Sequence, residues 1–328
     1  MKTVPLRLWA GFREHWVILL GLIAVAALIL AVDPGKVAHA LAGADSRAVV
    51  LMLPVVLVLY LLHGTAWWIA LRGADAGVGM PEAVRVTIIS QAFDLLPGGD
   101  LWRVPIVRSA DGEPLEAGML AATVVFDDLV YYFVLTFAMV PAAVRFPLLA
   151  ILMAVALLPQ VLIFTILLWS PVYDALVGRL SQNRVLHRFQ PQLALLGPSF
   201  RRLMTPRTLI PVAIVDAACA ILAISLFGLA LAAVHAAGVG FQRVAFTYAS
   251  GQVLSGLTVL PAALGIYEGM MTGLMAVQGV APAAAAAAAL LYRVINDVLM
   301  ALLGLAVALV SEREHLKQLE HRTEPVVH

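Results

Sequence analysis

The sequence predicts an all-α integral membrane protein, with about six transmembrane helices and two re-entrant broken-helix hairpins in an inverted-repeat arrangement. Three observations lead to this prediction. Of the 328 residues, 62% are hydrophobic and only 12% are charged, about half the charged share of an ordinary globular protein. Most apolar residues form runs of about 20, the length that a helix needs to cross a bilayer. Two further apolar stretches are shorter and end at proline or glycine.

Six apolar runs are long enough to cross a bilayer as tilted helices. They are residues 16–32, 49–71, 118–140, 147–170, 208–235 and 283–310. The first run follows a basic start but leads into the letters AVDPGK instead of a small-residue cleavage site. We therefore expect a retained helix rather than a removed signal peptide. Pro282 precedes the last run, where its missing N–H suits the first turn of a helix.

Two stretches are apolar but unsuited to a complete crossing. Residues 82–97 are too short and end at the turn formed by Pro97, Gly98 and Gly99. Residues 244–261 are barely long enough, contain two glycines and end at Pro261, and a second short run follows. Helices interrupted at membrane depth persist only where neighbouring protein or a wet cavity satisfies the freed backbone groups. The sequence therefore predicts a re-entrant hairpin at each stretch.

The stretch 171–207 sets the predicted orientation. It contains six arginines against a single acid, so the positive-inside rule places it as a basic cytoplasmic loop. We expect one polytopic domain over residues 1–328 in a bacterial-type cytoplasmic membrane, with both termini and the tail 311–328 inside. The hairpins then enter from opposite sides, which suggests inverted repeats at 49–170 and 208–310. Chance similarity between apolar segments is the alternative.

Ionisable residues in or beside the apolar segments are the main functional signal. An ionisable side chain at the bilayer centre costs on the order of 3 kcal/mol, and such residues usually face a cavity or a partner. Here they are Asp94, Asp100, Arg103, Asp127, Asp128, Asp216, Glu268, Arg293 and Asp297. Arg293 and Asp297 stand four residues apart, so a purely structural pair on one helix face is an alternative to function.

Three of these acidic residues leave open questions. Asp127 and Asp128 differ by about 100° around a helix, so at most one of them points squarely into a given cavity. Neighbouring carboxylates repel each other in a low dielectric, which makes coupling to a proton gradient a hypothesis. Transport that ignores a pH gradient would remove that hypothesis. For Asp216, structural pairing and function are equal alternatives.

No motif indicates a metal, a cofactor or nucleic acid. The single cysteine, Cys219, lies in an apolar run, and we expect it simply to pack. His63 stands near Trp67 and Trp68, which suggests an interfacial position, and it has no second histidine or carboxylate at ligand spacing. The formal charge of +1 gives no nucleic-acid signature. We therefore predict neither cofactor, nor metal, nor nucleic-acid partner.

The two helix breaks are the candidate binding site. The first break exposes backbone dipoles next to Arg103, whose guanidinium fork suits a phosphate, and Glu268 follows the second break. A cavity between them could hold a polar lipid head group while the acyl chains stay in hydrocarbon. The candidate substrate-binding residues are Asp94, Pro97, Gly98, Gly99, Asp100, Arg103, Asp127, Asp128, Glu268, Arg293 and Asp297.

At these residues the sequence resembles the membrane-domain family of lysylphosphatidylglycerol synthase/flippase proteins. The shared elements are LLPGGDLWR at 95–103, LPAALGIYEG at 260–269 and the LLYR that ends at Arg293. Ala262 and Ala263 stand where the family usually has glycine, and FDD at 126–128 replaces a common acid–arginine pair. The family's synthases carry a soluble aminoacyl-transferase domain after the membrane part. This sequence instead ends in a short charged tail at His328, so we do not expect that domain here. The resemblance therefore implies the flippase-like part, and synthase activity is not expected.

Three functions remain open from the sequence. The leading one is a lipid transporter, flippase- or scramblase-like, whose partners are membrane lipids with anionic or polar head groups. The second is a membrane-embedded transferase that modifies a lipid, with Asp127, Asp128 or Glu268 as acid or base. The third is a noncatalytic partner of a lipid-modifying complex. Self-association into a homo-oligomer is compatible with each of them.

Overall fold

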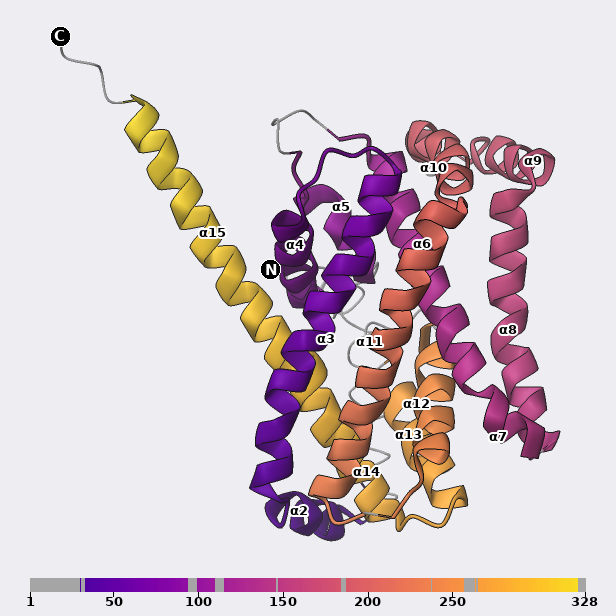
Figure 1. The fold of residues 1–328 in the computed structure, drawn as a ribbon, viewed down its shortest axis with the longest axis vertical. Helices are drawn as coiled ribbons and strands as arrows, with labels where there is room; N and C mark the ends of the chain where they lie inside the picture. The colour runs from indigo at the N-terminus through magenta and orange to yellow at the C-terminus, as the bar shows by residue number, and fades with distance from the viewer. Residues whose placement is uncertain are drawn as a thin grey trace, which may run out of the picture.

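The computed structural model describes residues 30, 33–93, 99–109, 115–145, 147–183, 187–236, 238–256, 263 and 265–323. Within these ranges the chain is helical and contains no strand (Figure 1). The prediction of an all-α protein is therefore confirmed.

Five helical segments in the described part are long and apolar enough to cross a membrane. They are Ser46–Gly73, Ala117–Val144, Ala150–Leu168, Pro206–Ala233 and Pro282–Ser311. They match five of the six predicted spans, while the first predicted span, 16–32, lies outside the described residues except for Leu30. The chain is thus a multi-pass membrane protein.

These segments comprise single helices and helices joined end to end. Their labels and bounds are α3 (Ser46–Gly73), α6 (Ala117–Ala138), α7 (Val140–Arg145), α8 (Pro147–Leu168), α11 (Pro206–Ala233), α14 (Pro282–Arg293), the π-helical η5 (Val294–Val298) and α15 (Leu299–Thr323). Helix α3 packs along α11, and α6 packs against both. Their contacts bury a core that includes Trp67, Phe126 and Phe227, because the apolar face of each helix must be covered by another helix where it does not meet lipid.

The two predicted hairpin regions form short helices. The first contains α4 (Met80–Ser90), η1 (Gln91–Phe93), η2 (Gly99–Trp102) and α5 (Arg103–Ile106). The second contains α12 (Phe241–Gly256) and α13 (Ile266–Val277). Each helix is shorter than the roughly 20 residues of a complete crossing. The predicted breaks thus coincide with helix ends, although Pro97, Gly98 and Pro261 themselves lie outside the described residues.

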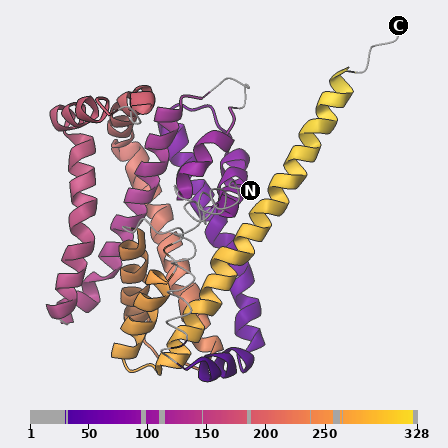
Figure 2. The ribbon, with the colours of Figure 1, turned by 180° about the vertical axis from the view of Figure 1, so that it is seen from behind.

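The short helices lie toward opposite ends of the molecule. Figure 1 shows α4 and α5 toward the end that carries α9 (Ser170–Leu180) and α10 (Gln190–Leu203). Helices α12 and α13 lie toward the other end, with α7 and α2 (Pro34–Ala42), and the view from behind shows the same arrangement (Figure 2).

Helices α4 and α15 approach each other closely. A Cβ atom on Gly304 of α15 would lie only 2.3 Å from the backbone oxygen of Ile88 in α4. Helix α15 also contacts η1, and Figure 2 shows it running obliquely past the first group of short helices. The last span therefore packs against the two helices that precede the first break.

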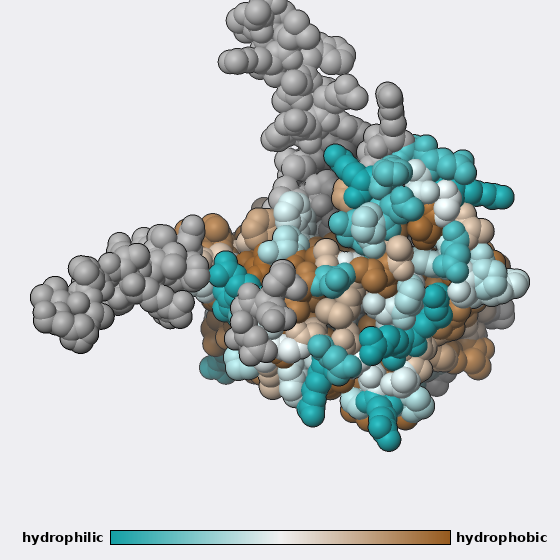
Figure 3. Space-filling model, turned by 90° about the horizontal axis from the view of Figure 1, so that it is seen from above, coloured by the Kyte–Doolittle hydropathy of each residue, from teal (hydrophilic) through white to brown (hydrophobic). Residues whose placement is uncertain are grey.

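The basic segment 171–207, predicted to connect two spans on the cytoplasmic side, is largely helical. It contains α9, η3 (His187–Phe189) and α10. Helix α10 packs on α6 and buries Phe200 and Leu203, which stand three residues apart on one helix face. The end of the molecule that carries these helices bears many hydrophilic side chains (Figure 3).

Candidate functional site

Arg103 is the centre of a buried ionic cluster at the first break. One terminal guanidinium nitrogen donates to Asp127 Oδ2 at 3.2 Å, and the other donates to Asp100 Oδ1. The side chains of Arg103 and Asp127 are only 4% and 5% exposed. The guanidinium carbon also lies 5.5 Å from the centre of the Trp67 ring, and the Trp67 indole donates to Thr123 Oγ1 at 3.0 Å. This arginine, the first residue of α5, is thus held by residues of α3, η2 and α6.

The neighbouring acids Asp127 and Asp128 have different environments. Asp127 is buried against Arg103, whereas Asp128 is half-buried. This outcome agrees with the expectation that the rotation between successive helix residues lets only one of the two point inward. The segment FDD at 126–128 has no arginine of its own, and Arg103 of another helix pairs with Asp127 instead.

A second buried ionic cluster surrounds Arg293. Its Nε donates to Glu268 Oε1 at 2.7 Å, and a terminal nitrogen donates to Asp297 Oδ2 at 2.6 Å. Arg293 and Asp297 therefore form the pair along one helix that the sequence left open as the structural alternative to function. The other oxygen of Glu268 accepts the backbone N–H of Gly265 at 2.7 Å and so caps the start of α13. The guanidinium carbon lies 5.2 Å from the centre of the Tyr267 ring.

Both clusters stand where a helix is irregular. Arg103 follows the 3-10 turn η2, and Arg293 immediately precedes the π-helical segment that contains Asp297. Such π-helical turns often occur at functional sites, because the wider turn frees backbone groups and redirects side chains. Each cluster holds one arginine and two carboxylates, so the formal charge of each is negative by one.

Polar side chains connect the first break with the π-helical segment η5. The Tyr60 hydroxyl of α3 donates to Gln91 Oε1 at 2.9 Å and lies 3.4 Å from the backbone oxygen of Asn296. Gln91 belongs to η1 beside the first break, and Asn296 belongs to η5 beside the second cluster. Sequence reasoning did not single out either residue, although a glutamine inside the apolar stretch 82–97 was a usable signal.

Three tyrosines line the packing between α6, α12 and α14. The Tyr292 hydroxyl donates to the Tyr248 hydroxyl at 3.1 Å, and that hydroxyl lies 3.4 Å from the Tyr131 hydroxyl. All three rings are buried.

The structure thus sorts the predicted site residues into two clusters. One contains Asp100, Arg103 and Asp127, with Gly99 and Asp128 adjacent in sequence. The other contains Glu268, Arg293 and Asp297. The predicted residues Asp94, Pro97 and Gly98 lie outside the described residues.

An open pocket of about 350 Å³ lies at the start of α12. Its polar lining comes from His235, Arg243 and Gln278, and it includes no residue of either ionic cluster. Gln278 donates to Thr247 of α12 at 2.7 Å, so the pocket borders the second group of short helices.

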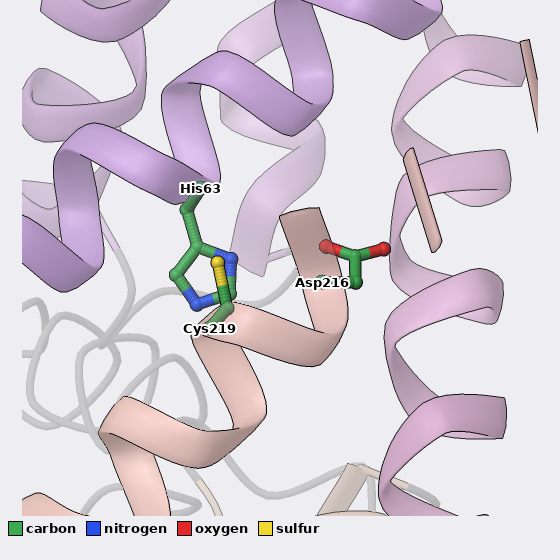
Figure 4. A group of neighbouring side chains, drawn as sticks. All are labelled: His63, Asp216 and Cys219. Atoms are coloured by element: carbon green, nitrogen blue, oxygen red, sulfur yellow. The ribbon is translucent and has the colours of Figure 1, made fainter. Parts of the chain in front are cut away.

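The packing of α3 on α11 creates a further group that the sequence did not predict. His63 comes from α3, while Asp216 and Cys219 come from α11 (Figure 4). One ligand atom from each of the three residues lies within 4.8 Å of the other two. The expectation that His63 has no carboxylate nearby considered spacing along the sequence, whereas the neighbours come from a helix about 150 residues later.

Comparison with known proteins identifies the family. No curated protein matches the chain. A family model described as "Lysylphosphatidylglycerol synthase TM region" matches residues 17–304, which is most of the chain. The match agrees with the resemblance carried by the two breaks and by Arg293, and with the five apolar helices. The chain therefore belongs to the lysylphosphatidylglycerol synthase TM region family, membrane proteins related to lipid metabolism or transport.

Proposed function

We propose that this protein is a flippase- or scramblase-like transporter that moves a lipid with a phosphate-bearing or otherwise polar head group across the cytoplasmic membrane. One observation supports the proposal above all. Beside each of two groups of short helices, at opposite ends of the molecule, an arginine that is at most 13% exposed is held by two carboxylates. Membrane interiors admit such charges at high cost, so their presence at two helix breaks favours a polar substrate.

The proposed path runs between two re-entrant hairpins. Helices α4 and α5 form the first hairpin and α12 and α13 the second, as the two halves of an inverted repeat. The arginine-rich end with α9 and α10 faces the cytoplasm by the positive-inside rule, so the first hairpin enters from that side. Tyr60 and Gln91, which connect the first break with η5, offer polar contacts along this path.

Exchange of ionic partners explains how a head group could pass without leaving a buried charge unpaired. Before a lipid binds, each arginine is paired with two carboxylates. A lipid phosphate can replace one carboxylate on the guanidinium fork, because phosphate and carboxylate oxygens both accept two parallel hydrogen bonds from arginine N–H groups. The displaced carboxylate can then accept a hydrogen bond from a hydroxyl or an amine of the same head group. Such an exchange avoids the large cost of an isolated buried ion.

The geometry favours transport over the transferase alternative. An acid or base for group transfer must reach the proton of a reacting group. Asp127 and Glu268 instead each accept a hydrogen bond from an arginine, and Glu268 also caps α13. These contacts suit residues that hold a charge in place.

The test is lipid movement in vesicles that contain the purified protein. We expect the wild type to accelerate the crossing of head-group-labelled phospholipid over empty vesicles. Arg103→Ala and Arg293→Ala should each slow it by at least about tenfold, because each removes charge-assisted hydrogen bonds of about 1.5–3 kcal/mol. Arg202→Ala is the matched control, since its pair with Asp75 is exposed and spans 3.7 Å. No acceleration by the folded wild type for any of several lipid classes would overturn the proposal.

A further inference from the structure

Three kinds of metal ligand meet where α3 packs on α11. His63 offers a ring nitrogen, Asp216 a carboxylate oxygen and Cys219 a sulfur, and the three atoms lie within 4.8 Å of one another (Figure 4). Asp216 and Cys219 stand three residues apart on α11, so they share one face of that helix. The group is thus presented by two rigid, packed helices.

Asp216 supplies an independent reason to look for a ligand. Its side chain is fully buried, and neither carboxylate oxygen has a hydrogen-bond partner among the described residues. The charges that act on it are those of Asp127, Asp128 and Arg103. Two of these carry its own sign, and Arg103 already binds two other carboxylates. A buried carboxylate without a partner is costly, so a compensating cation is expected there.

We propose that His63, Asp216 and Cys219 bind a divalent transition-metal ion of the zinc class. A thiolate and a carboxylate together carry two negative charges, so a divalent ion makes the site neutral and removes the burial cost. One nitrogen, one oxygen and one sulfur ligand suit zinc, which accepts all three in a tetrahedral shell. Three protein ligands leave the fourth position open for water or another oxygen ligand.

Binding requires a small rearrangement and the release of protons. Metal–ligand distances of about 2.0–2.3 Å place tetrahedral ligand atoms roughly 3.3–3.8 Å apart. Rotation about side-chain bonds must therefore draw the three groups together by about an ångström. The Cys219 thiol releases its proton to water as the metal–sulfur bond forms, and so does Asp216 wherever it holds one.

Two aromatic rings lie beside His63 at this site. The Tyr131 ring meets the His63 ring edge-on, with centres 5.0 Å apart, and Tyr60 lies 6.0 Å away. His63 is half-buried while Asp216 and Cys219 are fully buried, so the histidine is the accessible side of the cluster. The proposed metal site does not depend on lipid transport, and metal binding can be tested separately from it.

Cobalt provides a direct test, because the chain contains a single cysteine. The full chain is purified in detergent, stripped with a chelator and titrated with Co²⁺. We expect a sulfur-to-cobalt charge-transfer band that saturates at one ion per chain, together with the visible bands of a tetrahedral site. Zinc should abolish both signals by displacing the cobalt. Absence of the sulfur band in the folded wild type would overturn the proposal.

Variants and X-ray absorption separate this site from other binding. Cys219→Ser should eliminate the band, and His63→Gln and Asp216→Asn should each weaken binding by at least about tenfold. His235→Gln changes an exposed histidine in the turn after the end of α11, and this variant should bind like the wild type. Should a variant fail to fold, X-ray absorption of the zinc-loaded wild type must show one sulfur at about 2.3 Å and an imidazole. A zinc coordination shell without a sulfur or an imidazole contradicts the site. Unchanged metal affinity in folded His63→Gln and Asp216→Asn also contradicts it.

Discussion

Arg103 joins two acidic residues in the protein interior, and its removal should destabilise the fold strongly. Arg103→Ala leaves Asp127, which is 5% exposed, without its cation. Breaking a buried ion pair in this way costs about 3–5 kcal/mol. We expect this decrease in the free energy of unfolding, measured by denaturant titration in mixed micelles.

Two comparisons make this prediction specific. Arg202→Ala removes an ion pair whose side chains are 71% and 84% exposed, so its cost should stay below about 1 kcal/mol. Adding Asp127→Asn to Arg103→Ala should recover part of the loss, because no unpaired charge then remains. Equal effects of Arg103→Ala and Arg202→Ala would show that the buried pair is not what stabilises this region.

Ala263 adopts a backbone conformation that favours glycine. Its φ is 48°, in the left-handed region. An L-residue with a side chain pays about 1–2 kcal/mol for this conformation. Ala263→Gly should therefore be less destabilising than Ala287→Gly by about 1–2 kcal/mol, since Ala287 is a buried helical residue. Thermal unfolding of the two variants side by side measures the difference, and identical losses would contradict the strain.

At the scale of helices, the contact of α15 with α4 depends on Gly304. A Cβ atom at this position would lie 2.3 Å from a backbone oxygen, and backbone cannot yield as a side chain can. Gly304→Ala should therefore cost about 1–3 kcal/mol in unfolding free energy. Gly273→Ala in α13 is the matched control, because nothing lies within 4 Å of its added methyl group. It should be neutral or stabilising by up to about 1 kcal/mol, and a similar loss in both variants would refute the close approach.

The long helices were predictable because hydropathy is a local property. Five apolar runs became five candidate spans with ends within a few residues. Helices α9 and α10 were not predicted, because prolines and arginines interrupt the apolar signal there and only one face is buried. Phe200 and Leu203 carry that face, and a search for helical spacing instead of mean hydropathy would have found it.

The site was predictable where it follows from spacing along one helix. Helical geometry predicts that at most one of Asp127 and Asp128 points inward and allows Arg293 to pair with Asp297. It does not say which aspartate is buried, and the structure shows that it is Asp127. The pairing of Arg103 with Asp127 and the meeting of His63 with Asp216 depend on how separate helices pack. No pattern in a single sequence contains that information.

At the scale of the molecule, the proposed orientation places the end with α9 and α10 in the cytoplasm. The reason is the excess of arginine over acid in residues 171–207. In a Cys219→Ser background, a cysteine at Gln182 should react with a membrane-impermeant thiol reagent only from the cytoplasmic side. A cysteine at Gly240, exposed toward the opposite end, should react only from outside. The reverse pattern would invert the proposed topology.

Mapping the contacts of a lipid head group tests the central claim most directly. A phospholipid with a photoreactive group on its head group is incorporated into vesicles with the protein, irradiated, and its adducts are located by mass spectrometry. The account predicts adducts on peptides that contain Gln91 to Arg103 and Ser255 to Glu268, which flank the two breaks. Adducts confined to outward-facing apolar residues, such as the exposed Leu158 and Leu162 of α8, would contradict passage between the hairpins.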